Sequence, residues 1–129
     1  MNLPEKYLDL VSNDSRAMLF LATLMRDGSP QVTPVWFSFD GEYILINTAE
    51  RRAKERNMKH RPRVAMTIQD PNDPYRYLGI RGEIESYTNE GADDHINALS
   101  FKYKGVPFNI PAGQKRIIFR IRLLHFDEH

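Results

Sequence analysis

Residues 26–48 read RDGSPQVTPVWFSFDGEYILINT, and they decide the fold of this 129-residue chain. The turn residues Asp27-Gly28-Ser29-Pro30 separate two apolar runs, 17–25 and 31–39, which predicts a β-hairpin. Asp40-Gly41 is a pair that two-residue hairpin turns prefer, so a third strand from Tyr43 should pair with the second. Pro34 has no N–H to donate to a neighbouring strand and therefore indicates an edge or bulge position.

The rest of the sequence continues with strand patterns bounded by turn signals. Strands are predicted over 64–68, about 75–87 and 116–126, where apolar residues recur at every second position. Gly82, inside the second of these, indicates a bulge, a barrel corner or a close backbone approach. The last strand has apolar residues on both faces, so it should lie inside the sheet.

Two or three short helices are predicted around these strands. Pro4 suits the first turn of an N-terminal helix, and Asn89 is a candidate cap for a helix with an apolar stripe that stops at Gly105. A further helix is expected to start from a cap at Asn47 or Thr48. Six strands with these helices predict a mainly β protein, an antiparallel barrel that forms one domain over residues 1–129.

The composition excludes several classes of function. The chain has no cysteine, which rules out disulfides and thiol nucleophiles and favours a reducing compartment. Eighteen basic and 17 acidic residues give a net charge of +1, so no overall charge attracts nucleic acid or an anionic membrane. The N-terminal segment does not read as a leader, and the longest apolar run, 17–25, is too short to span a membrane. We expect a soluble, cytoplasmic protein without a nucleic-acid or membrane partner.

A basic segment follows the third strand. Seven of the thirteen residues from Arg51 to Arg63 are Arg or Lys, against a single acid, Glu55. Few of these residues are apolar, so core packing does not explain the segment. A strand ending in Asn47-Thr48, a helix N-terminus and several cations together favour a phosphate-binding site. Two other interpretations stay open, a solvated basic face and a nucleic-acid patch.

Three strings, in this order and spacing, resemble the split β-barrel family of pyridoxamine-phosphate-oxidase-like proteins. They are DGSPQVTPVWF at 27–37, NTAERRAKERN at 47–57 and PRV at 62–64. Within this family the chain is more similar to the branch that uses the deazaflavin coenzyme F420. The resemblance implies a six-stranded antiparallel split β-barrel of the FMN-binding type. It also implies a homodimer with cofactor sites at the interface.

The resemblance further implies which residues hold the cofactor. The second strand would lie along the flavin or deazaflavin ring, and a strand-end Thr with the cations after it would hold the phosphate. A polar position one turn later and an aromatic region of the fifth strand, often from the other subunit, complete the set. The candidate cofactor-binding residues are Val32, Thr33, Pro34, Val35, Trp36, Thr48, Arg52, Lys54, Asn57 and Tyr77. Tyr75 matches the same region as Tyr77, and ordinary barrel-face aromatics are the alternative interpretation of both.

The activity implied by the resemblance is hydride transfer from reduced coenzyme F420 to a small conjugated or quinone-like acceptor. FMN is the alternative cofactor, because both cofactors carry a phosphate. Two other classes remain: a barrel that binds single-stranded nucleic acid, and a non-catalytic cofactor or tetrapyrrole carrier. The C-terminus lacks the Arg-x-His substrate motif of the true pyridoxamine phosphate oxidases, so vitamin B6 oxidation is not expected. We expect the loop 106–114 to influence the choice of acceptor.

No other catalytic pattern is visible in the sequence. The four histidines are scattered without metal-ligand spacing, and no Gly-x-Ser-x-Gly elbow occurs. Hydride transfer needs few catalytic side chains, because the cofactor carries the reactive atom. We therefore assign no catalytic residue and no metal ligand.

Overall fold

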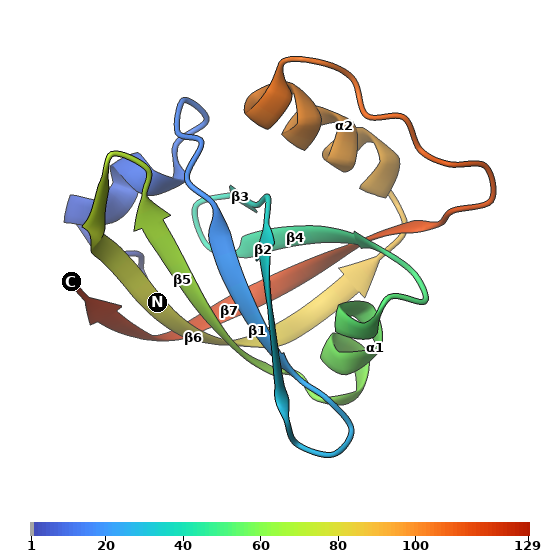
Figure 1. The fold of residues 1–129 in the computed structure, drawn as a ribbon, viewed down its shortest axis with the longest axis horizontal. Helices are drawn as coiled ribbons and strands as arrows, with labels where there is room; N and C mark the ends of the chain where they lie inside the picture. Colours follow the sequence, from blue (N-terminus) through green and yellow to red (C-terminus); the bar gives the residue numbers. More distant parts are fainter. Residues whose placement is uncertain (1) are drawn as a thin grey trace.

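Seven strands form one antiparallel sheet in the computed structural model, which describes residues 2–129 (Figure 1). The sheet curls into a half-barrel with strand order β2-β1-β5-β6-β7-β4-β3. The strands are β1 (Leu19–Leu24), β2 (Pro30–Val35), β3 (Ser38–Phe39), β4 (Ile44–Ala49), β5 (Arg63–Asp70), β6 (Asp73–Thr88) and β7 (Arg116–Glu128). The helices are the 3-10 helix η1 (Glu5–Val11) and the α-helices α1 (Ala53–His60) and α2 (Ala92–Lys104). The mainly β antiparallel fold expected from the sequence is confirmed.

The first hairpin forms where the turn residues predict it. β1 pairs with β2 from Leu24 opposite Pro30 to Leu19 opposite Val35, and Gly28 in the turn has a φ of +89° that favours glycine. β2 is an edge strand, which is the position that Pro34 requires.

The predicted strand 31–39 is interrupted, so the sheet has seven strands and not six. β2 ends at Val35, and the chain resumes pairing only at β3, which lies against β4 at the opposite edge of the sheet. One continuous segment, residues 30–39, therefore supplies both edges of the curled sheet. It changes partner at Trp36 and Phe37, because one straight strand cannot follow both β1 and β4.

Gly82 marks the bend of the long strand β6, as the sequence suggested. The pairing of β6 with β7 shifts register between Arg81 and Gly82. A Cβ atom at Gly82 would lie 2.8 Å from the carbonyl oxygen of Arg122 and 2.8 Å from Cγ2 of Ile121. Both the bulge and the close backbone approach are confirmed.

The prediction for the start of helix α1 was wrong. Asn47 and Thr48 belong to β4, and α1 begins at Ala53 with Arg52 as an N-cap in extended conformation and no side-chain cap. Between strand and helix the chain reverses at Arg51, whose φ of 76° is left-handed. Helix α2 ends at Gly105 as predicted, but Asn89 does not cap it, because its amide donates to the carbonyl of Arg116 at 2.7 Å.

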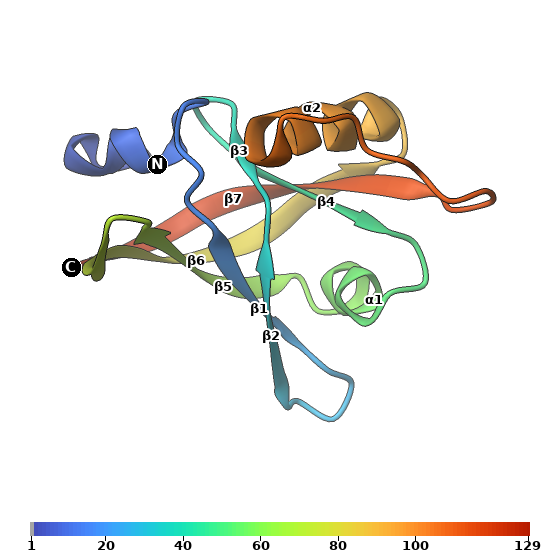
Figure 2. The same ribbon diagram turned by 45° about the horizontal axis from the view of Figure 1, so that its top comes forward.

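The helices lie outside the curled sheet, with α2 across β4 and β7 and α1 beside β1 (Figure 2). The hydroxyl of Tyr7 in η1 donates to the carbonyl of His129 at 2.7 Å, so the two ends of the chain meet. Among residues 2–129, no helix combines the length and the apolar composition that crossing a bilayer requires. The largest fully buried core side chains are Phe37, Phe119, Leu19, Leu21, Ile44, Ile46, Met58, Ile68, Leu78, Ile80, Ile117 and Ile121.

Candidate functional site

A cavity of about 240 Å³ lies beside the end of β4, next to the first turn of α1 and under α2. Six of the ten residues that were predicted from the sequence to bind a cofactor line this cavity. Its lining residues are Met18, Pro34, Val35, Trp36, Asn47, Thr48, Arg52, Lys54, Ile96, Phe108 and Arg116. None of them is acidic.

The local backbone explains why these residues meet. β4 pairs with β7 so that Ala49 lies opposite Arg116, which places the end of one strand against the beginning of the other. The N–H of Glu50 donates to the carbonyl of Lys115 at 2.9 Å and continues this pairing by one residue. The left-handed turn at Arg51 then sends the chain back, so that Arg52 and Lys54 lie beside the strand end.

Three cations line this cavity. Within residues 2–129, none of the ion pairs involves Arg52, Lys54 or Arg116. Burial lowers the pKa of Lys54, and the charges of Arg52 and Arg116 lower it further. Burial and the charge of Arg52 also lower the pKa of Arg116, although Asp93 acts in the opposite direction. The cavity is therefore positively charged at neutral pH and suited to an anion.

An aromatic wall stands next to the cations. The indole of Trp36 stacks on Tyr103 with ring centroids 5.4 Å apart and planes 5° from parallel. Tyr103 is held in turn by its hydroxyl, which donates to the carbonyl of Ala17 at 2.7 Å. Phe108 from the loop before β7 also lines the cavity, and its N–H donates to Oδ1 of Asn97 at 3.0 Å. A positively charged end and an apolar wall suit a ligand with a phosphate and a flat ring.

Arg116 is the main lining residue that the sequence did not reveal. Only 7% of it is exposed, yet it is charged. Its Nε donates to Oδ1 of Asn47 at 2.9 Å, and its Nη1 donates to Oε1 of Gln114 at 3.0 Å. The signal that could have found it is a basic residue at the start of a strand, directly before the apolar Ile117 and Ile118, but only the pairing of β4 with β7 shows what it faces.

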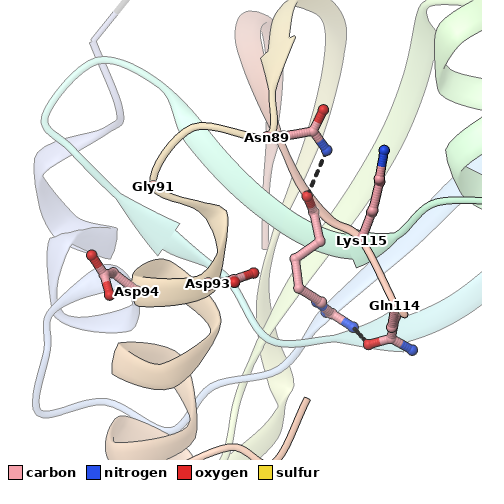
Figure 3. A pocket seen from close by; sticks show the side chains of 7 residues that line it. Asn89, Gly91, Asp93, Asp94, Gln114 and Lys115 are labelled. Atoms are coloured by element: carbon pink, nitrogen blue, oxygen red, sulfur yellow. Dashed lines mark hydrogen bonds between the residues drawn. The ribbon is translucent and has the colours of Figure 1, made fainter. Parts of the chain in front are cut away.

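A second cavity, of about 400 Å³, lies on another side of Arg116. It is lined by Asn89, Gly91, Asp93, Asp94, Gln114, Lys115 and Arg116. Figure 3 shows Asn89 reaching from the end of β6 to the strand that carries Arg116, while Asp93 and Asp94 leave α2 in different directions. Since this cavity has two carboxylates, it lacks the unopposed positive charge of the first.

Four predicted site residues do not line the first cavity. Thr33 contacts a lining residue of the cavity, because its Oγ1 accepts a hydrogen bond from Nζ of Lys54 at 3.2 Å. Val32 lies on the outer face of β2 and is 61% exposed. Asn57 is buried, and its amide donates to Oγ1 of Thr23 at 3.0 Å. The ring of Tyr77 stacks on His129, with centroids 4.5 Å apart.

The outer part of the basic segment makes structural contacts. Lys59 forms an ion pair with the buried Glu55 at 2.7 Å. Nε of Arg61 donates to the carbonyl of Leu24 at 2.7 Å and ties α1 to β1. Of the seven cations between Arg51 and Arg63, only Arg52 and Lys54 line the first cavity. In the described part of the chain, no group of three or more His, Asp or Glu side chains is arranged to hold a metal ion.

The sequence as a whole matches the family model described as pyridoxamine 5'-phosphate oxidase over residues 3–128. The chain belongs to this family. The family resemblance inferred from the three sequence strings is confirmed.

Solved structures of other proteins have the same fold. An F420 reductase is 34% identical, with a TM-score of 0.86 over 98% of this chain and 100% of that one. HupZ of Group A Streptococcus is 16% identical, with a TM-score of 0.69 over 98% and 93% of the two chains. HutZ, a heme storage protein of Vibrio cholerae, is 14% identical, with a TM-score of 0.67 over 99% and 95%. The last two likenesses concern the fold alone.

Proposed function

We propose that this protein is a coenzyme F420-dependent oxidoreductase that passes a hydride to a small conjugated or quinone-like acceptor. The observation that carries the proposal is the cavity in which Arg52 and Lys54 face no carboxylate and adjoin the aromatic wall at Trp36. The 34% identity to an F420 reductase over nearly the whole chain supports this cofactor over FMN.

The residues of the cavity fit the chemistry of the cofactor's phosphate. Arg52 and Lys54 supply charge-assisted hydrogen bonds, and the buried hydroxyl of Thr48, near the end of β4, adds a neutral donor. Val35 and Trp36 present apolar surface on which a flat ring excludes water. The deazaflavin ring, when bound, supplies the hydride, so the protein needs to bind and orient it and to keep water away.

We also propose that the complete site is formed by a homodimer. A cavity of about 240 Å³ is smaller than the roughly 300–1,000 Å³ of typical ligand sites, so one chain encloses only the phosphate end of the cofactor. Pro34 shares one face of the β1–β2 hairpin with three exposed apolar residues, Phe20, Leu24 and Val32. Val32 is the most exposed of the three, at 61%. A second copy of the chain packed on this face would cover the apolar side chains and close the ring site.

The activity test uses reduced coenzyme F420 and a naphthoquinone as acceptor. The expected result is protein-dependent reoxidation of the cofactor, followed by the recovery of its visible absorbance, and a loss of this activity in Lys54→Met. If reoxidation is no faster than in buffer, or if only reduced FMN is turned over, the proposed function is wrong.

Static light scattering tests the dimer, and Val32→Glu should yield a monomer that no longer oxidises the reduced cofactor. A wild-type protein of monomer mass would refute the dimer.

A further inference from the structure

The buried guanidinium of Arg116 is held at the cavity by a chain of hydrogen bonds that reaches into helix α2. Oδ1 of Asn47 accepts from Nε of Arg116 at 2.9 Å. Nδ2 of the same amide donates to the carbonyl of Ala92 at 2.8 Å and to Nδ1 of His95 at 3.1 Å. The reverse orientation of the amide would place two donors together at Arg116 and two acceptors together at Ala92. The contacts therefore admit a single orientation of Asn47.

The same reasoning fixes the state of His95. Its Nδ1 accepts from Asn47, so the proton is on Nε2, which donates to Oγ of Ser38 at 2.9 Å. Burial, together with the charge of Arg116, lowers the pKa of His95 to about 4, which keeps the ring neutral at physiological pH. The neutral ring orients Asn47, and Asn47 orients Arg116.

One end of the guanidinium remains free for a ligand. Nε and Nη1 are bonded to Asn47 and Gln114, whereas Nη2 has no partner among residues 2–129. No fully enclosed side-chain nitrogen or oxygen in the described residues lacks a hydrogen bond. Nη2 is therefore not fully enclosed, and Arg116 lines both the cavity with Arg52 and Lys54 and the cavity with Asp93 and Asp94. Because Nε and Nη1 are held by hydrogen bonds and Nη2 is not, the guanidinium is already oriented before an anion binds.

We propose that Arg116 is a third anion-binding residue of this site, and that Asn47 and His95 are positioning residues through which helix α2 controls it. The proposal rests on the proposed function for the identity of the anion, the cofactor's phosphate. It adds a residue from the last strand to the two from the α1 turn. The anion would thus be held from two sides of the β4–β7 pair.

The test compares coenzyme F420 with a ligand that lacks its phosphate and the tail attached to that phosphate. Arg116→Gln, Asn47→Ala and the control Arg120→Gln are titrated with coenzyme F420 and with its phosphate-free deazaflavin nucleoside. Arg120 is on the same strand but exposed, and it does not line the cavity. Arg116→Gln should weaken F420 binding about tenfold to a hundredfold, because a charge-assisted hydrogen bond is lost. Asn47→Ala should weaken it about threefold to tenfold with the charge intact. Neither variant should change the affinity for the nucleoside.

Side-chain NMR of the arginines, with inorganic phosphate as the probe, separates this inference from the proposed function. The Nε–H signal of Arg116 should be protected in the wild type, shift on addition of phosphate, and lose its protection in Asn47→Ala and in His95→Leu. A phosphate shift without F420 binding would keep the anion site and refute the proposed cofactor. If Arg116 does not respond to phosphate, or if both variants lose F420 and the nucleoside equally, Arg116 has only a structural role and the inference is wrong.

Discussion

Replacing Lys54 by methionine should weaken cofactor binding without destabilising the folded protein. The ammonium group of Lys54 is partly buried next to Arg52 and Arg116, and Oγ1 of Thr33 accepts its hydrogen bond at 3.2 Å. Within residues 2–129 it forms no ion pair with a carboxylate. Its pKa is lowered in the folded state, so the unfolded chain holds the proton more readily and the charge opposes folding at neutral pH. Methionine keeps most of the length of the side chain and removes the charge.

The two effects have different sizes. The lost charge-assisted contact to a phosphate is worth about 1.5–3 kcal/mol, which corresponds to a cofactor dissociation constant about ten- to a hundredfold higher. The free energy of unfolding should stay unchanged or rise by up to about 1 kcal/mol, as is common when a charge kept for binding is removed. Fluorescence titration with coenzyme F420 measures the first quantity, and urea unfolding without cofactor measures the second.

Lys59 on the same helix is the matched control. Its ammonium group pairs with the buried carboxylate of Glu55 at 2.7 Å, and this hydrogen bond raises its pKa. Lys59→Met should therefore destabilise the protein, because Glu55 loses its ion-pair partner, and it should leave cofactor affinity unchanged. The reasoning would be refuted if Lys54→Met bound the cofactor like the wild type, or if the two variants changed stability in the same direction.

Three further predictions concern the fold around the site. Because burial lowers the pKa of His95 to about 4, the free energy of unfolding should fall by up to about 3 kcal/mol as the pH drops from about 6.5 to about 4. Urea titrations should show a shallower pH dependence for His95→Gln, and equal slopes would contradict this origin. Gly82→Ala should cost about 1–3 kcal/mol in chemical denaturation, because its Cβ would lie 2.8 Å from the carbonyl oxygen of Arg122, and a neutral result would contradict the close approach. Asn57→Ala should cost about 1–3 kcal/mol, since it removes the amide between Thr23 and Arg61, and it should leave the preference for F420 over its phosphate-free nucleoside intact; a lost preference would place Asn57 in the phosphate site.

Local signals in the sequence were sufficient for much of the fold. The turn at Asp27 to Pro30, the edge position of Pro34 and the bend at Gly82 follow from properties of single residues, namely turn chemistry, a missing N–H and a missing side chain. The end of α2 at Gly105 has the same origin, because this residue has a left-handed φ of 73°.

The errors occurred where distant contacts decide the structure. Thr48 looks like a helix cap, but pairing with Ile117 keeps it in β4, and no other capping signal marks the true start of α1 at Ala53. The break between β2 and β3 depends on which strands form the two edges, and the local sequence does not contain that information.

In the candidate site, too, some residues could be predicted from local sequence and others depend on distant contacts. Arg52 and Lys54 were found because they are close in sequence to Thr48, within one recognisable string. Arg116 and His95 come from other parts of the chain and reach the site only through the β4–β7 pairing and the packing of α2. In an isolated sequence, a basic residue at a strand start and a histidine on a helix are ordinary surface features.

The most direct test of the central claim is a fluorescence titration of the purified wild-type protein with coenzyme F420, and separately with FMN. If the cavity at Arg52 and Lys54 holds the phosphate of a deazaflavin cofactor, F420 should saturate the protein at micromolar concentration or below, and more tightly than FMN. A protein that binds FMN but not F420, or neither of them, would contradict the account.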